Sequence, residues 1–214
     1  MGERMKLLPP EFTYVNDPRI ILSIDYAGYE NFIGRPIAGY HAKCAILTKP
    51  AHAALIAVQD TLDSYQKGYR LKIFDAYRPT LAVADFKHWA GDPNDQKQKS
   101  IYYPDLDKAE LHQRGYVAFE KSTHSRGSTV DLTITVASIN PLNFDDLPMG
   151  TIFDLFGEKS HTEYPNISKT ERNNRQFLKK LMENHGFKNY EKEWWHFTLE
   201  NEPFPATYFE FPVQ

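Results

Sequence analysis

The sequence predicts a mixed α+β domain in which helices flank a small, mostly antiparallel sheet. Three observations predict this class. Segments with apolar residues at three- and four-residue steps, typical of amphipathic helices, alternate with short segments typical of strands. The predicted order is helix, strand, helix, helix, strand, helix, strand. Residues 1–214 contain no internal repeat, low-complexity tract or Gly/Ser-rich linker, so we expect a single domain.

The first half of the chain supplies two predicted helices and one strand. Residues 50–66 predict a helix, with Gly68 as its cap, because apolar residues recur with helical spacing at Ala54, Leu55, Val58, Leu62 and Tyr65. Residues 70–77 alternate as a strand does, and Arg78-Pro79 ends it. Residues 80–90 predict a second helix with Pro79 near its first turn, and the Gly-Asp-Pro-Asn-Asp segment at 91–95 ends it.

The second half supplies the other four elements. Residues 107–113 predict a short helix closed by Gly115, and residues 128–136 alternate as a strand that places Asp131 on the polar face. Residues 138–168 are rich in Pro, Asp and Gly and predict a long, loop-dominated excursion, which is more often functional than idle. Residues 169–185 predict the last helix, ended by Gly186, and the aromatic segment 194–199 predicts the last strand.

Composition excludes several classes of protein. The formal charge is only −3, so nothing favours binding to nucleic acid or to an anionic membrane. Aromatic residues make up 14% of the chain, enough for a proper core. Cys44 is the only cysteine, so an intramolecular disulfide and a cysteine-based zinc site are both excluded. No signal peptide or membrane span is visible, so we expect a cytoplasmic protein, or a periplasmic one if a leader was removed.

Two clusters of residues indicate a metal site. His124 and Asp131 flank the turn at Arg126-Gly127, and the bend can bring the imidazole near the carboxylate. His196 supplies a third ligand if its strand lies beside the strand of Asp131. Two histidines and one carboxylate, with a fourth position left to water, are the ligands of a catalytic zinc site.

Glu193 lies three residues before His196, at the expected start of the last strand. From a bend there, its carboxylate can reach a metal-bound water without binding the metal itself. This is the geometry of a general base.

Each of these residues also has an ordinary structural interpretation. His124 can be a turn residue, Asp131 a charge at a strand edge, and Glu193 a solvated neighbour of a core Trp pair. Taken together, the three ligand types and a glutamate without another role support a metal site about as well as these structural interpretations. The remaining histidines lack a matching carboxylate, and His185 is placed to complement a helix C-terminus.

Arg78 has two interpretations that the residues alone leave open. It follows the predicted strand at 70–77 and can pair with Asp75 as a surface ion pair. Alternatively, its guanidinium lies beside the metal and stabilises negative charge on an attacked carbonyl. Removing one such donor typically costs about 2.7–4 kcal/mol of transition-state stabilisation.

The motif Ser-Xaa-His-Xaa-Xaa-Gly-Xaa-Xaa-Xaa-Asp at 122–131, together with Glu-Trp-Trp-His at 193–196, resembles the zinc D-alanyl-D-alanine dipeptidases of the VanX type. These belong to peptidase family M15, a larger group of zinc D,D-peptidases that shares its fold with the Hedgehog signalling domain. The zinc motifs alone specify only the larger group. Further matching segments point to the dipeptidases: YAGYENFIGRPIAGY at 26–40, DAYRP at 75–79, MGTIFD at 149–154 and YFEFP at 208–212.

The resemblance implies a role for each matching residue. It places the ligands of one Zn²⁺ at His124, Asp131 and His196, the catalytic base at Glu193 and the transition-state arginine at Arg78. It places the carboxylate that binds the substrate ammonium at Asp154, with Tyr26 nearby, and puts Ser122 and Tyr40 around the substrate carboxylate. The implied reaction is hydrolysis of the free dipeptide D-Ala-D-Ala to two D-alanines.

Two rival functions remain open at this stage. A D,D-carboxypeptidase or endopeptidase on the same scaffold would act on peptidoglycan stem peptides. The excursion at 138–168 discriminates between this rival and a dipeptidase, because only dipeptides fit if it closes the ammonium side of the cleft. A zinc-stabilised binding module without activity is the other rival, and Glu193 and Arg78 argue against it. The sequence leaves open a homo-oligomer, and whether the role is glycopeptide resistance or dipeptide recycling.

Overall fold

The computed structural model describes residues 8–138 and 143–214. Its main sheet has the strand order β2-β4-β5-β8-β7, and β6 pairs with β5 beside this path. These strands are β2 (Ile21–Leu22), β4 (Tyr69–Asp75), β5 (Thr129–Ala137), β6 (Phe144–Asp146), β7 (Phe187–Asn189) and β8 (His196–Leu199). Every pair is antiparallel except β2 with β4. A second, antiparallel pair joins β1 (Phe12–Tyr14) and β3 (Ile46–Thr48). The predicted α+β class and mostly antiparallel sheet are confirmed.

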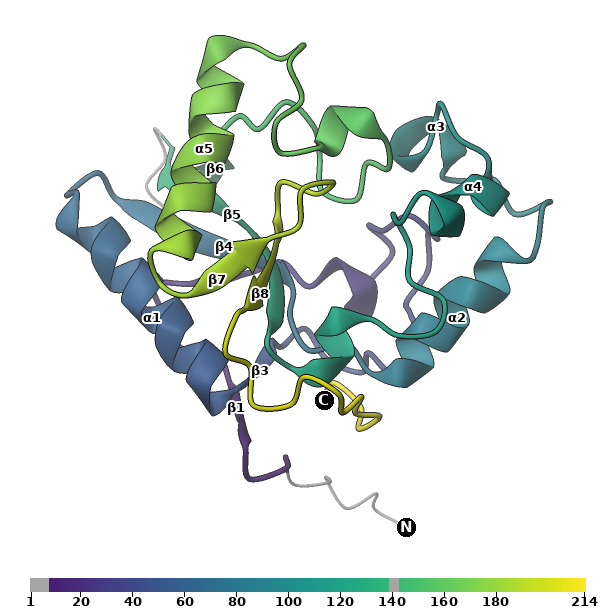
Figure 1. The fold of residues 1–214 in the computed structure, drawn as a ribbon, viewed down its shortest axis with the longest axis horizontal. Helices are drawn as coiled ribbons and strands as arrows, with labels where there is room; N and C mark the ends of the chain where they lie inside the picture. Colours follow the sequence, from purple (N-terminus) through teal and green to yellow (C-terminus); the bar gives the residue numbers. More distant parts are fainter. Residues whose placement is uncertain (1–7, 139–142) are drawn as a thin grey trace.

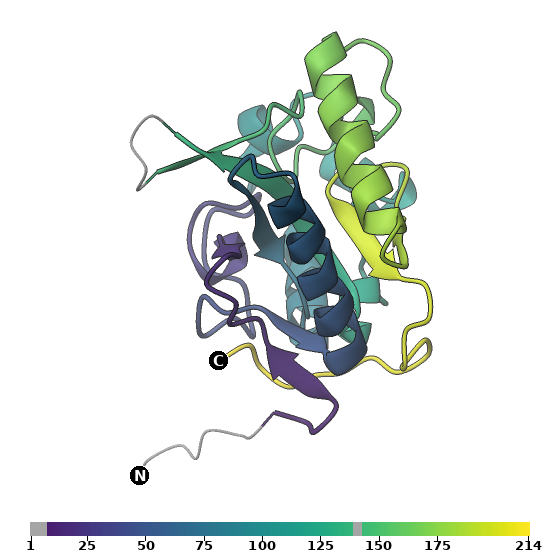
Figure 2. The ribbon, with the colours of Figure 1, turned by 90° about the vertical axis from the view of Figure 1, so that its left-hand side faces the viewer.

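Helices lie on both sides of this sheet (Figure 1). On one side are α1 (Lys49–Ser64) and α5 (Lys169–Glu183), and on the other are α2 (Thr80–Ala90), α3 (Lys99–Tyr102) and α4 (Lys108–Gln113). Figure 2 shows α1 and α5 side by side. They meet where the rings of Tyr65 and Phe177 lie 5.7 Å apart and where Thr61 Oγ1 lies 3.0 Å from His185 Nε2.

The predicted helices and strands all occur, with shifted ends. The first helix ends at Ser64 and the last at Glu183, each two residues before its predicted end. The strand predicted at 70–77 stops at Asp75, and the one predicted at 194–199 starts only at His196. Trp194 lies outside the ladder because its backbone N–H donates to Ser160 O instead.

The polar face of β5 is buried as completely as its apolar face. Val130, Leu132 and Ile134 enter the core on one side, while Asp131 and Thr133 are buried on the other. Asp131 pairs in register with His196 of β8 and with Asp75 of β4, where a register shift interrupts the ladder. The adjacent ends of three strands thus bring residues from distant segments to one place.

The excursion at 138–168 is loop-dominated, as predicted, but contains two short elements. These are β6 and a 3₁₀ turn, η3 (Glu158–Ser160). Residues 139–142 of the excursion lie outside the described residues. Among the helices of the described part of the chain, none combines the length and apolarity needed to cross a bilayer.

Candidate active site and metal centre

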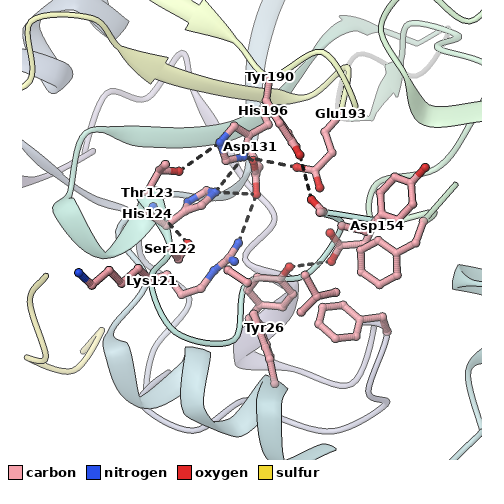
Figure 3. A pocket seen from close by; sticks show the side chains of 18 residues that line it. Tyr26, Lys121, Ser122, Thr123, His124, Asp131, Asp154, Tyr190, Glu193 and His196 are labelled. Carbon is pink, nitrogen blue, oxygen red and sulfur yellow. Dashed lines mark hydrogen bonds and ion pairs between the residues drawn. The ribbon is translucent and has the colours of Figure 1, made fainter. Parts of the chain in front are cut away.

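Three side chains from three elements converge at the end of the sheet (Figure 3). His124 lies in η2 (Thr123–Arg126), Asp131 in β5, and His196 at the start of β8. His124 Nε2 lies 3.2 Å from Asp131 Oδ2, and His196 Nδ1 lies 3.0 Å from Asp131 Oδ1. The two imidazole nitrogens lie 3.3 Å apart. Of the described residues, this is the group of His, Cys, Asp and Glu that meets the spacing of a metal site.

Each imidazole has a hydrogen-bond partner on its other nitrogen. His124 Nδ1 lies 2.6 Å from the carbonyl oxygen of Ala76, and donation there leaves the lone pair of Nε2 facing Asp131. His196 Nε2 lies 3.2 Å from Thr123 Oγ1, so its Nδ1 is the nitrogen that faces the cluster. Such partners set the tautomer and the ring orientation of metal-binding histidines.

The buried carboxylate of Asp131 fits a cation. Its Oδ1 is buried and, although His196 Nδ1 lies 3.0 Å away, it accepts no hydrogen bond of good geometry among the described residues. Burial alone would raise the pKa of Asp131, but the two imidazoles outweigh burial and lower it. Burial lowers the pKa of His196, against the pull of Asp131, which favours the neutral imidazole that binds metal. Two neutral imidazoles and a carboxylate are a donor set that suits Zn²⁺.

Glu193 lies beside this cluster in the turn before β8. Its Oε2 is 3.5 Å from His196 Nδ1, and the backbone N–H of His196 donates to the Glu193 carbonyl. Glu193 is only 9% exposed. Burial raises its pKa well above the ordinary value, and the nearby Asp131 and Asp154 carboxylates raise it further. The predicted bend at Glu193 is thus present, and the carboxylate is next to the three candidate ligands without being one of them.

Arg78 pairs with Asp75, as one of the two interpretations has it, but inside the pocket and not on the surface. Its Nε donates to Asp75 Oδ2 at 2.8 Å, while its second terminal nitrogen lies 3.4 Å from Asp131 Oδ2. It is 8% exposed and lines the pocket, so it is a buried cation and the surface interpretation is wrong. The guanidinium also lies over the rings of Tyr26 and Phe86, at 5.1 and 5.2 Å.

Asp154 lies on the other side of the pocket, on a segment of the excursion. It has a φ of 60°, which is uncommon for a residue with a side chain. Tyr26, from η1 (Asp25–Ala27), donates to Asp154 Oδ2 at 2.7 Å. Burial raises the pKa of Asp154 well above its ordinary value, although the Tyr26 hydrogen bond lowers it. Arg78, farther away, lowers it as well, but in the described part of the chain no Lys or Arg forms an ion pair with this carboxylate.

The pocket between these residues is small. Its volume is about 180 Å³, below the roughly 300–1,000 Å³ of typical small-molecule pockets. Besides the residues already described, it is lined by Phe32, Gly115, Tyr116, Val117, Ala118, Lys121, Ser122, Thr123, Phe156 and Tyr190. Ser122 caps η2 by accepting from the His124 N–H, and it faces the pocket as the resemblance implies.

Tyr40 does not line the pocket, although the resemblance places it near the substrate carboxylate. Its hydroxyl donates to Asp75 Oδ1 at 2.6 Å, and the residue is buried behind Arg78. The backbone of Tyr40 forms an isolated bridge with Val213 of the C-terminal segment. In this structure Tyr40 orients Asp75, which in turn orients Arg78.

Sequence reasoning missed the groups that orient the ligands. Thr123, next to His124 in the motif, could have been found because a hydroxyl so near a ligand is an available partner. The Ala76 carbonyl could not, since a backbone acceptor has no sequence signal. Outside the site, His185 Nδ1 contacts the Leu181 carbonyl at a helix end, which confirms its predicted structural role.

The D-Ala-D-Ala dipeptidase model of peptidase family M15 matches residues 14–214. This chain belongs to that family. It is therefore a peptidase, and the predicted resemblance is confirmed.

Curated relatives of this M15 peptidase carry the name D-alanyl-D-alanine dipeptidase. The relative from Enterococcus faecalis is 43% identical over 188 residues, 88% of this chain and 90% of the relative. The relative from Enterococcus faecium is 41% identical over 189 residues, with the same coverage. The relative from Streptomyces coelicolor is 40% identical over 188 residues, again 88% of this chain and 90% of the relative.

A solved structure with a similar arrangement is a mutant of VanY, a vancomycin-resistance D,D-pentapeptidase from a VanB-type cassette, in complex with Zn(II). It is 12% identical, the match covers 73% of this chain and 74% of that one, and the TM-score is 0.42. A likeness this weak supports no statement about the function of the M15 peptidase described here.

Proposed function

We propose that this peptidase hydrolyses the free dipeptide D-Ala-D-Ala to two D-alanines, with one Zn²⁺ held by His124, Asp131 and His196. The observation that carries the proposal is the juxtaposition, in one small pocket, of this ligand set with Glu193, Arg78 and Asp154. When bound, zinc lowers the pKa of a coordinated water to about 7 and supplies positive charge beside the scissile carbonyl.

Glu193 transfers the proton in this reaction, and Arg78 stabilises the negative charge that develops. Glu193 accepts a proton from the attacking water as its oxygen bonds to the carbonyl carbon. Arg78, held by Asp75, donates to the oxygen that becomes negatively charged. Glu193 then delivers the proton to the amide nitrogen as the C–N bond breaks, which releases one D-alanine as a free amine.

Binding of a free dipeptide follows from charge at the far side of the pocket. The Asp154 carboxylate is buried and, among the described residues, accepts from Tyr26 and forms no ion pair, so a substrate ammonium would supply a cation in direct contact with it. A stem peptide has an amide nitrogen in place of this ammonium and would leave Asp154 unpaired, at a cost of about 1–3 kcal/mol or more. Asp154 and Phe156, both from the excursion, line this side of the pocket and favour the dipeptide over the stem-peptide rival.

The experiment is to measure D-Ala release from free D-Ala-D-Ala and from N-acetyl-D-Ala-D-Ala, with zinc content determined on the same samples. The zinc-loaded protein should prefer the free dipeptide, and Asp154→Ala should lower kcat/KM for it by about 10- to 100-fold, the loss of a charge-assisted contact. The same variant should change turnover of the acetylated substrate little. Equal losses on both substrates would remove the ammonium role of Asp154.

Two further expectations remain proposals. A cytoplasmic location agrees with the single, unpaired Cys44, which needs no oxidising compartment. The partner that the groups of the site match is a small dipeptide.

A further inference from the structure

Arg175 stands out among the buried charges outside the pocket. It lies on α5 and is fully buried. Glu171, on the same helix, is the carboxylate that acts on it electrostatically, but the two form no ion pair in the described part of the chain. Burial lowers its pKa to about 10. A charge buried without a counter-ion is costly unless its donors are well satisfied, so its contacts need an explanation.

Among the described residues, its hydrogen bonds go to backbone carbonyls at the two ends of one segment, residues 149–161. Nε donates to the Met149 carbonyl at 2.6 Å. The two terminal nitrogens donate to His161 and Lys159, at 2.6 and 2.9 Å. One rigid, planar group thus holds both ends of a segment with little regular structure.

The middle of that segment carries Asp154. This residue has left-handed backbone geometry at φ 60°, which costs of order 1–3 kcal/mol and persists only where the surroundings enforce it. Ser160 adds one internal contact, since its Oγ donates to the carbonyl of Leu155, the neighbour of Asp154. The position of the Asp154 carboxylate therefore depends on how the ends of the segment are held.

Glu193 itself is anchored by groups outside this segment, although its neighbour Trp194 donates its backbone N–H to the Ser160 carbonyl and its Nε1 to Thr151 Oγ1. The backbone N–H of Glu193 donates to the Tyr190 carbonyl, and its own carbonyl accepts from Asn189 Nδ2 at 3.1 Å. A displacement of the 149–161 segment should therefore move the ammonium-binding carboxylate more than the general base.

We propose that Arg175 is a positioning residue for the substrate ammonium, acting through Asp154 by holding both ends of the 149–161 segment. This inference rests on the proposed function of the pocket and deepens it. Arg175 lies outside the pocket lining and touches no substrate. It sets how well the pocket recognises a free amino terminus.

The test is Arg175→Lys in the full-length, zinc-loaded enzyme, assayed with D-Ala-D-Ala. Lysine keeps the charge but is a single point donor that cannot span the three carbonyls. We expect KM to rise about 10- to 100-fold, as for a misplaced binding group, with kcat changed less than about threefold. In the Asp154→Ala background, Arg175→Lys should raise KM no further, because both changes remove one interaction.

Two control variants lie on the same helix. Arg172→Lys makes the same exchange at an exposed residue that donates to Pro165, outside the segment. Leu178→Ala removes a fully buried core side chain and lowers stability without touching these carbonyls. Both should keep the wild-type KM. If Arg175→Lys does not fold, Ser160→Ala takes its place and should give a smaller increase in KM with kcat retained.

The outcomes separate this inference from the proposed function. Loss of kcat with unchanged KM, or losses in Arg175→Lys and Asp154→Ala that multiply, would overturn the role of Arg175. Wild-type protein that binds zinc but releases no D-Ala would instead contradict the proposed function itself.

Discussion

At the scale of single residues, the two candidate histidine ligands use different nitrogens. His124 presents Nε2 because its Nδ1 contacts the Ala76 carbonyl, and His196 presents Nδ1 because its Nε2 contacts Thr123. The Thr123 hydroxyl and the Ala76 carbonyl thus determine which ring nitrogen of each histidine faces Asp131. Neither group is a ligand, yet each should affect metal affinity.

Thr123→Val tests this indirect role. Valine keeps the shape of threonine but cannot accept a hydrogen bond from His196 Nε2, so zinc affinity should fall by about 10- to 100-fold. The measurement is competition for zinc with a chelator of known affinity. Thr123→Ser keeps the hydroxyl and should bind zinc nearly as well as the wild type. Equal affinity in the valine and wild-type proteins would show that Thr123 does not orient His196.

Side-chain chemistry decides which site residues sequence reasoning can find. His124, Asp131, His196 and Glu193 have types and spacings that predict a metal site, and the structure brings them together. The acceptor at Ala76 and the donor pattern of Arg175 depend on backbone positions, which leave no trace in residue types. Tyr40 is not among the residues that line the pocket and instead donates to Asp75, so its place near the substrate carboxylate stays a prediction from the resemblance.

At the scale of elements, the turn between η2 and β5 determines the distance between His124 and Asp131. Gly127 has a φ of 82°, and a Cβ there would lie 2.2 Å from Phe12 Cε1. Phe12 also packs edge-on against Tyr77, the neighbour of Arg78. The glycine therefore permits both the left-handed turn and close packing under the site.

Gly127→Ala should disrupt this turn. The added methyl group clashes with the Phe12 ring and the backbone is strained, so the free energy of unfolding should fall by more than about 2 kcal/mol, with weaker zinc binding. Gly68→Ala is the matched control, because Gly68 also has a positive φ, of 68°, but open space around it. That variant should lose only about 1 kcal/mol. Denaturant titrations of both variants compare the effects, and similar losses would contradict the packing argument.

Length and periodicity explain which elements could be predicted. The helices α1, α2 and α5 and the strand β5 are long enough to show a periodic pattern. β2 has two residues, and β1, β3, β6 and β7 have three each, too few to reveal alternation. Their pairing depends on partners far along the chain, which no local pattern specifies.

At the scale of the whole molecule, the site joins segments that are distant in sequence. The C-terminal segment contributes to this joining, because the backbone N–H of Phe209 donates to the Ser125 carbonyl and Tyr77 donates to Phe211. Arg126 also pairs with Glu202 at 2.7 Å. Zinc bound between η2, β5 and β8 would add a further link among these segments.

Zinc should therefore stabilise the folded chain. At a free zinc concentration 1,000 times Kd, linkage gives about 4 kcal/mol, or a rise in Tm of roughly 8–16 °C for a chain of this size. Thermal scans with and without a chelator measure the shift. Asp131→Asn removes the charged ligand, so its Tm should respond little to zinc. A wild-type Tm that does not respond to chelation would contradict a site with three ligands from separate elements.

The most direct test of the account is Glu193→Gln, with bound zinc and D-Ala release measured on the same sample. We expect one zinc ion per chain, as in the wild type, and a kcat lowered by roughly 10²–10⁴-fold, the usual contribution of a general base. Loss of zinc would show that Glu193 is a ligand. Retained zinc with wild-type turnover would contradict the assignment of Glu193 as the base.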